Sequence, residues 1–277
     1  MDSQASSPAA TSPVPTPKLG GLLRDWRRRR RLSQLDLAME AEVSARHLSF
    51  VETGRSRPSR ELVLKLAELL GLPLRERNQW LLAAGFAPAF AESPLQSPAL
   101  AHAREAVRRV LDLHAPYPAV AVDRHWNLEM ANRCAQRLLS TVDADLLQQP
   151  NVLRLSLHPQ GLAPQIVNLA EWRRHLLARL RRQVEDSGDA QLADLLGELS
   201  AYPPLPHEHG PHDTPASAAP DVLMLFRLRS PLGELALFST ITVFGTPVDV
   251  TLSELALESF YPADAATAER LRALAGA

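Results

Sequence analysis

Residues 44–59, SARHLSFVETGRSRPS, combine a serine that can cap a helix with a histidine, a phenylalanine and three arginines. An arginine guanidinium can form two parallel hydrogen bonds with guanine, and an aromatic ring can pack against a thymine methyl group. A merely solvated helix would carry more acidic residues and would gain nothing from an exposed aromatic ring. The segment therefore has the chemistry of a helix that contacts nucleic acid.

A helix that starts after Ser44 would have two different faces, because successive residues turn by about 100°. One face would hold Ala45, Leu48, Val51 and Glu52. The opposite face would hold Arg46, Ser49, Phe50 and Thr53. Gly54 would end the helix, and Arg55 and Arg57 follow it where a DNA backbone would run. We expect the outer face to contact bases and the two later arginines to contact phosphates.

Five short helices can position this segment. Apolar spacing predicts the first from Leu19, and serines that can act as N-caps predict the next three after positions 33, 44 and 59. Ser33 and Asp36 have the spacing of a capping box. A fifth helix is expected over about 74–84, so residues 18–90 should form a compact all-α domain with a helix-turn-helix around 41–43.

The charge of the chain is divided unevenly. The net charge is −1, but residues 18–61 carry +5 and the remainder carries −6. The run RRRRR at 27–31 contributes to the basic block. Consecutive residues fan around a helix, so we count this run only as electrostatic support. A basic block joined to an acidic one indicates that one part of the chain meets a polyanion.

The motif LSQLDLA…VS…LSFVETGRSRPS, within residues 19–71, resembles the lambda-repressor-like (Cro/XRE) helix-turn-helix. The resemblance implies that Gln34, the Thr53 amide and Arg55 bind phosphates. It places Ala45, Arg46 and Phe50 at base-contacting positions, where Ala45 replaces a polar residue often found there. It also implies a partly buried pair between Arg27 and Glu52.

The second part of the chain has an α+β pattern. Residues 91–98 are typical of a linker, and 99–114 of an amphipathic helix. Residues 118–132 predict two strands around a tight turn at Asp123-Arg124, and helices are expected over 132–139, 168–186 and 189–200. Two more strands are expected as a hairpin over 222–244 and a fifth over 255–261, and a final helix follows. Residues 99–277 should thus contain a five-stranded antiparallel sheet.

This order is similar to that of a PAS-like domain, and the whole chain resembles the MmyB-like regulators. The matching stretches are YPAVAVDRHWNLEMAN, NVLRLSLHP, NLAEWRRHLL and STITVFGTPVDVTLSELALESFYPAD. The resemblance implies a helix-turn-helix coupled to a PAS-like domain. It also implies an apolar cleft between the sheet and the inserted helices, able to hold a lipophilic molecule such as a fatty acid.

Both faces of the strand over 234–244 are largely apolar, so both should be covered, one by the 99–114 helix and the other by the inserted helices. Large side chains in this region are candidates to line a pocket: Trp126, Met130, Trp172, Leu176, Phe238 and Phe244. The same residues could equally fill a core, because an apolar pocket and an apolar core have the same composition.

Other chemistries are poorly supported. HEHGPHD at 207–213 lies in a Pro-rich stretch and lacks the helical His spacing of a zinc motif, so no metal is expected. Cys134, the one cysteine, has no accompanying catalytic constellation, and we expect no catalytic residue, no cofactor and no enzyme. Residues 1–17 should be a disordered tail without a signal peptide, and no segment should span a membrane. A cytoplasmic protein is expected.

The leading hypothesis is a homodimeric transcription regulator that binds an operator in double-stranded DNA and responds to a small apolar ligand. In the alternative, the second domain is only a dimerisation or protein-docking module. An enzyme that uses the His-rich segment is a third hypothesis, with less support.

Overall fold

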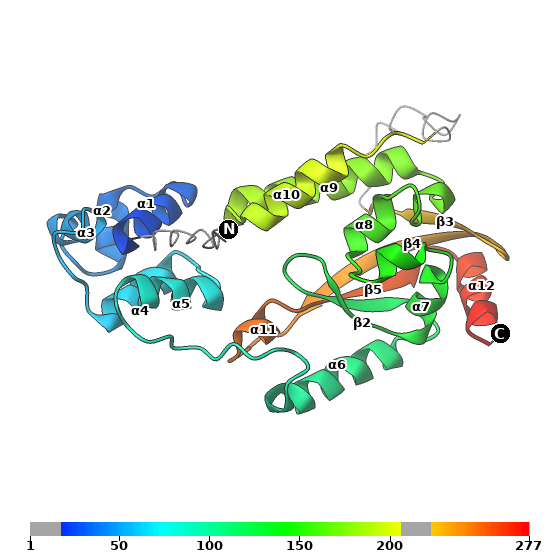
Figure 1. Ribbon diagram of the computed structural model, residues 1–277, viewed down its shortest axis with the longest axis horizontal. Helices are drawn as coiled ribbons and strands as arrows, with labels where there is room; N and C mark the ends of the chain where they lie inside the picture. Colours follow the sequence, from blue (N-terminus) through cyan, green and yellow to red (C-terminus); the bar gives the residue numbers. More distant parts are fainter. Residues whose placement is uncertain (1–17, 206–222, 277) are drawn as a thin grey trace, which may run out of the picture. The chain divides into compact units, whose positions relative to one another are not determined.

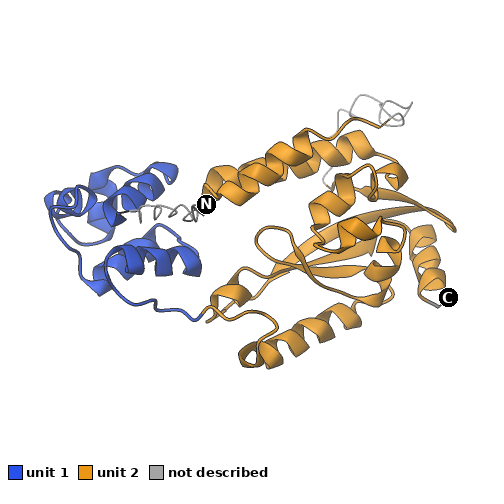
Figure 2. Cartoon of the chain, viewed as in Figure 1, with its two compact units in different colours: residues 1–91 blue, residues 92–277 orange. Residues whose placement is uncertain are grey.

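The computed structural model describes residues 18–205 and 223–276 and divides into two compact units, residues 1–91 and 92–277 (Figures 1 and 2). The expected tail over 1–17 and the segment HEHGPHD lie outside the described residues.

The first unit contains the five predicted helices. They are α1 (Leu19–Arg29), α2 (Gln34–Glu40), α3 (Ala45–Glu52), α4 (Arg60–Leu69) and α5 (Leu74–Ala83). The capping box at Ser33 is present, since its hydroxyl accepts from the Asp36 amide at 3.1 Å while Asp36 accepts from the Ser33 amide at 2.9 Å. Ser44 and Ser59 cap α3 and α4 through their hydroxyl groups, as the sequence predicts.

One glycine permits the close approach of α1 to α3. A Cβ atom at Gly20 would lie 2.3 Å from the carbonyl oxygen of Glu52, well inside van der Waals contact. At the neighbouring Gly21, a Cβ would meet nothing within 4 Å. Only the absence of a side chain at position 20 therefore lets the backbones of the two helices touch.

A buried carboxylate joins three helices of this unit. Glu52, at the end of α3, accepts hydrogen bonds from Arg27 Nε at 2.7 Å and Nη2 at 3.1 Å. It also accepts from Gln34 Nε2 at 2.7 Å. Burial raises the pKa of Glu52, but these hydrogen bonds and the positive charges of Arg27 and Arg24 outweigh burial, so the pKa lies below its ordinary value. The ionised carboxylate fastens α3 to α1 and α2.

The second unit is built on a five-stranded antiparallel sheet, as predicted. Its strands are β1 (Ala119–Val122), β2 (Leu128–Ala131), β3 (Phe226–Ser230), β4 (Gly233–Val243) and β5 (Ala256–Pro262). Their order in the sheet is β2-β1-β5-β4-β3. The first and last parts of the domain thus meet at the centre of the sheet, where β1 pairs with β5.

One face of the sheet is covered by α6 (Ala101–Leu113), with the short 3-10 helix η1 (Pro98–Leu100) before it (Figure 1). Val107 and Leu111 of α6 pack on Ala119 and Ala121 of β1. Leu95, in the segment expected to be a linker, is buried in the same cluster. This segment is therefore partly anchored to the second unit.

The opposite face is covered by the segments inserted between β2 and β3 (Figure 1). These are α7 (Arg133–Leu139), α8 (Val152–Leu157), α9 (Leu169–Ser187) and α10 (Ala190–Ser200), with the 3-10 helices η2 (Ala144–Leu147) and η3 (Ala163–Gln165). The sequence did not predict α8, the 3-10 helices or α11 (Val250–Ser253). The final helix, α12 (Ala265–Gly276), contributes Leu271 to this core.

The prediction that both faces of the 234–244 strand are covered is wrong for its last residues. Ile241 and Val243 are 40% and 61% exposed. The five residues of β3 pair only with Gly233–Leu237 of the eleven-residue β4. The second half of β4 therefore extends beyond its partner strand as an uncovered edge.

Substituting the two adjacent glycines should have opposite effects. Gly20→Ala should lower the free energy of unfolding by about 1–3 kcal/mol, because the new methyl group meets the α3 backbone. Gly21→Ala should raise it by up to about 1 kcal/mol through helix propensity. Hydrogen-exchange rates of α1 in the full chain would measure both changes, and equal effects would contradict the close approach.

Removing the charge of Glu52 should destabilise the first unit strongly. Glu52→Gln leaves Arg27 buried without a counter-charge, and breaking a buried pair in this way costs about 3–5 kcal/mol. Glu42→Gln is the matched control, since Glu42 pairs with Lys65 on the surface and its side chain is 81% exposed. The control should have little effect, because solvent screens this exposed pair. Hydrogen exchange across α1, α2 and α3 would compare the two variants, and similar protection in both would disprove the proposed role of Glu52.

Candidate nucleic-acid interface and apolar pocket

The outer face of α3 presents a cation stacked on an aromatic ring. The guanidinium carbon of Arg46 lies 5.3 Å from the centre of the Phe50 ring. Arg46 is exposed, whereas Phe50 and Ser49 are half-buried, so the ring is less open than the helical spacing suggested. The contact holds Arg46 against the helix and leaves its hydrogen-bond donors available to a ligand.

Ala45 lies differently from the other proposed base-contacting residues. It is half-buried and packs against the core of the first unit. Its helical spacing also placed it on the inner face, together with Leu48 and Val51. A methyl group in this position offers no hydrogen bond, so polar contacts from the outer face of α3 must come from Arg46 and Ser49.

The proposed phosphate contacts differ in availability. Arg55 and Arg57 are exposed and follow Gly54, whose φ of +73° turns the chain away from α3. The Thr53 amide is not available, because it donates to the Ser49 carbonyl oxygen at 3.0 Å within the helix end. Gln34 donates its side-chain amide to Glu52, and thus it supports α3 instead of reaching outward alone.

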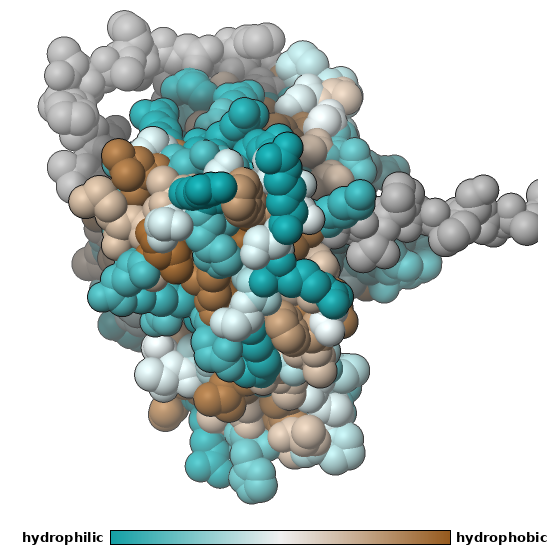
Figure 3. Space-filling model, turned by 90° about the vertical axis from the view of Figure 1, so that its left-hand side faces the viewer, coloured by the Kyte–Doolittle hydropathy of each residue, from teal (hydrophilic) through white to brown (hydrophobic). Residues whose placement is uncertain are grey.

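Part of the arginine run is structural. Arg27 forms the buried pair with Glu52, and Arg30 donates from Nε to the Leu70 carbonyl oxygen at 2.9 Å. The guanidinium groups of Arg29 and Arg30 lie 5.3 and 5.4 Å from the Trp26 ring. Hydrophilic side chains predominate on the side of the molecule where α2 and α3 lie, with apolar residues between them (Figure 3).

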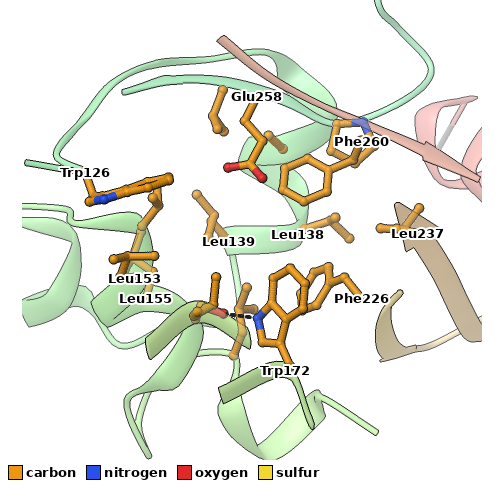
Figure 4. Close-up of a pocket in the computed structure, with 17 residues that line it drawn as sticks. Trp126, Leu138, Leu139, Leu153, Leu155, Trp172, Phe226, Leu237, Glu258 and Phe260 are labelled. Atoms are coloured by element: carbon orange, nitrogen blue, oxygen red, sulfur yellow. Dashed lines mark hydrogen bonds between the residues drawn. The ribbon is translucent and has the colours of Figure 1, made fainter. Parts of the chain in front are cut away.

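The second unit contains an apolar cavity of about 90 Å³ between the sheet and the inserted segments. Figure 4 shows Trp126, Trp172, Phe226 and Phe260 around it. The predicted residues Trp126, Trp172 and Leu176 line this cavity. It lies within the main core cluster of the unit.

Three of the predicted pocket residues do not line it. Met130 and Phe244 pack in the cluster beneath α6, on the other face of the sheet. Phe238 stacks on Tyr261 with ring centres 5.3 Å apart. Successive strand residues point to opposite faces, and these three side chains lie on the face away from the cavity. Their apolar character alone could not reveal this.

Trp126 reaches the cavity from the predicted tight turn, which lies one residue later than expected: Arg124 and His125 are at its centre, and the Trp126 amide donates to the Asp123 carbonyl oxygen at 3.1 Å. The loop spans 123–127, and Trp126 has a φ of +69°. Asp123 Oδ1 accepts from the amides of His125 and Asn127, each at 2.8 Å. The indole nitrogen of Trp126 donates to Gln183 Oε1 at 2.9 Å. These bonds fix the indole over the cavity.

Hydrogen bonds also tie this loop to neighbouring elements. Arg124 pairs with Asp189, the N-cap of α10, and with Glu254 at 3.2 Å. His125 Nε2 lies 3.0 Å from the same Asp189 carboxylate. The pKa of Asp189 lies below its ordinary value because the hydrogen bond from His125 and the charge of Arg124 together outweigh its burial, which acts in the opposite direction.

Two polar residues line the cavity, and neither was among the predicted pocket residues. Ser156 accepts a hydrogen bond from Trp172 Nε1 at 2.8 Å. Glu258 is only 7% exposed, and its carboxylate points into the cavity in Figure 4. An acidic residue at an inward position of the apolar stretch ALESFYP was the available signal.

The described residues do not favour other kinds of site. Within 18–205 and 223–276, no group of three or more His, Cys, Asp or Glu side chains could hold a metal ion. No helix in this part of the chain has the length and apolar character needed to cross a bilayer. Burial raises the pKa of the Cys134 thiol despite the charges of Arg137 and Arg133, which disfavours the thiolate.

Two family models match the chain. One described as "MmyB-like transcription regulator ligand binding domain" matches residues 103–274, and one described as "Helix-turn-helix domain" matches residues 18–80. No curated protein matches the chain.

Two solved structures are similar to parts of it. The clp gene regulator ClgR from Corynebacterium glutamicum is 30% identical, covers 37% of this chain and 99% of its own, and has a TM-score of 0.22. An RNA-binding light-oxygen-voltage receptor is 12% identical, covers 91% of this chain and 60% of its own, and has a TM-score of 0.28. These TM-scores are too low to bear on fold or function.

The ligand-binding-domain model covers more than half of the chain and follows a matched helix-turn-helix. Both models describe parts of a transcription regulator and not of an enzyme. The chain therefore belongs to the MmyB-like transcription regulators and joins a DNA-binding helix-turn-helix to a ligand-binding domain.

Proposed function

We propose that this regulator recognises a specific operator through α3 and that a small apolar molecule with a fatty-acid-like chain modulates its DNA affinity. In this proposal, residues 18–90 bind DNA, 91–98 connect the domains, and 99–277 bind the ligand and form a homodimer. The protein acts in the cytoplasm, where a bacterial-type operator would lie.

The observation that carries the DNA-binding part is the Arg46–Phe50 contact on the outer face of α3. The helix beneath it is capped by Ser44 and fastened by the Glu52 network. A rigid helix that presents an arginine fork beside an aromatic ring suits the major groove, where guanine offers two acceptors and thymine a methyl group. Arg46, Ser49 and Phe50 would contact bases, while Ala45 would approach them closely.

The residues around α3 would set its register on the backbone. Arg55 and Arg57 would contact phosphates directly, and Gln34 would do so through the part of its amide that Glu52 leaves free. The Thr53 side chain would contribute least, because its hydroxyl already donates to the Ser49 carbonyl oxygen at 2.8 Å. Helix-turn-helix proteins of this kind bind as dimers to half-sites about 34 Å apart.

The observation that favours a ligand over a purely dimerising second domain is the cavity and its buried carboxylate. A ligand would change DNA affinity only if it bound more tightly to one arrangement of the protein than to another. The alternative, in which the second domain only dimerises or docks a protein, leaves the exposed Ile241 and Val243 edge as a contact surface.

Arg46 and Arg55 should affect DNA binding in different ways. Once an operator has been selected with the native protein, Arg46→Ala should reduce discrimination at one base pair by about 1–3 kcal/mol. Arg55→Ala should weaken binding to all sequences and lower the slope of log K against log salt by about one. Anisotropy titrations on operator and scrambled DNA would measure both, with Arg108→Ala on α6 as the control. Equal losses of Arg46→Ala on both DNAs would refute base recognition.

Filling the cavity should remove the effect of the ligand on DNA affinity. Ala135 lines the cavity, so Ala135→Leu should abolish ligand binding while leaving the DNA affinity of the ligand-free protein intact. Ala193→Leu on an exposed position of α10 is the matched control. In the native protein and the control, a bound ligand should change operator affinity at least about fivefold. Native mass spectrometry would report ligand occupancy, and occupancy without any change in DNA affinity would support the dimerisation or docking alternative.

A further inference from the structure

The buried Glu258 carboxylate gives the cavity a specific polar requirement. Among the described residues that line the cavity, it is the one with an ionisable acid, and its neighbours there are almost all apolar. It projects from β5, where its register partner on β4 is Ile241. In Figure 4 the carboxylate points between Trp126, Leu139 and Phe260.

Glu258 is only partly satisfied by the protein. The Ser239 hydroxyl donates to its Oε1 at 2.7 Å. Among the described residues, no donor forms a hydrogen bond with Oε2. A carboxylate oxygen that lacks a donor in a largely apolar cavity is poorly solvated, so a ligand that supplies a donor would gain binding free energy.

The positive charge of Arg179 does not supply the missing hydrogen bond. Arg179 of α9 interacts electrostatically with Glu258, but its guanidinium carbon lies over the Trp126 ring, 4.4 Å from the centre. Burial raises the pKa of Glu258, while the Ser239 hydrogen bond and the Arg179 charge oppose this rise. The charge of Arg179 thus lowers the pKa of Glu258 less than burial raises it, and Arg179 donates no hydrogen bond to the carboxylate among the described contacts.

This arrangement discriminates among ligand head groups. A ligand carboxylate would place a second anion beside Glu258 or would require one of the two acids to bind a proton. A ligand ammonium would lose its hydration in an apolar cavity where Arg179 already provides a positive charge. A hydroxyl or an amide N–H can donate to Oε2 without either cost.

We infer that the pocket selects an amphiphilic molecule whose apolar part packs among Trp126, Trp172 and Phe226 and whose uncharged hydroxyl or amide donates a hydrogen bond to Glu258. This inference rests on the proposed function, in which the cavity binds a ligand. Such a ligand would share the apolar chain of a fatty acid but would carry a neutral hydrogen-bond donor in place of the carboxylate head.

The size of the cavity limits what fits without rearrangement. Its volume is about 90 Å³. This is room for a head group and the first carbons of a chain. A longer chain requires side chains such as Leu138, Leu139 and Leu176 to move apart, so short probes give the clearest test of head-group selection.

The test compares three probes of equal chain length on the full-length protein at pH 7.5: 1-octanol, octanamide and octanoate. Isothermal titration calorimetry should give dissociation constants for the alcohol and the amide at least about tenfold lower than for octanoate, the ratio that 1.4 kcal/mol of binding free energy produces. Glu258→Gln removes the charge and should reduce this ratio to about threefold or less. Glu105→Gln, on the exposed surface of α6, should leave the ratio unchanged.

The outcomes separate the inference from the proposed function. If octanoate binds the native protein as tightly as octanol, the inferred selection by Glu258 is wrong, while a ligand pocket stands. If the native protein prefers octanol but Glu258→Gln keeps the full preference, another group makes the selection, and the inference is equally overturned. If no probe binds the native protein, both the inference and the ligand part of the proposed function fail. The comparison on the native protein holds even if Glu258→Gln does not fold.

Discussion

The first unit depends on one buried carboxylate. Glu52 ends the recognition helix α3, and its hydrogen bonds to Arg27 and Gln34 connect that helix to α1 and α2. A buried charge must be paired, and pairing it fixes the position of every element that supplies a donor. The missing side chain of Gly20 brings α1 close enough for this pairing, and the outward position of Arg46 follows from the inward position of Glu52.

The second unit also contains a buried carboxylate, but this one accepts fewer hydrogen bonds than Glu52. Glu258 also lies inside an apolar layer, but within residues 18–205 and 223–276 only Ser239 donates a hydrogen bond to it. The pKa of Glu52 is lowered and the pKa of Glu258 is raised, because hydrogen bonds from cationic and amide donors dominate at the first and burial dominates at the second. A fully satisfied acid serves the fold, whereas a partly satisfied acid in a cavity is suited to a ligand.

The sheet separates a filled apolar core on one face from an apolar cavity on the other. Residues beneath α6, such as Met130 and Phe244, fill a core, while Trp126 and Trp172 on the other side border a cavity. The inserted helices leave a cavity on that side, and the pairs of Arg124 with Asp189 and of Arg154 with Glu198 tie α10 to the 123–127 loop and to α8.

The sequence by itself determined the helices of the first unit, the outward position of Arg46 on α3, the pairing of Arg27 with Glu52 and the order along the chain of the strands of an α+β second unit. These follow from caps, helical spacing and strand signals, which act between near neighbours, together with a family resemblance. Only the tertiary structure decided that Met130, Phe238 and Phe244 face away from the cavity, that the Thr53 amide is occupied, and that Glu258 points inward. The physical reason is that both faces of β4 and β5 are largely apolar, so local alternation cannot identify which face lies under the inserted helices. That choice depends on contacts between segments more than 70 residues apart, such as Trp126 and Glu258 across one cavity.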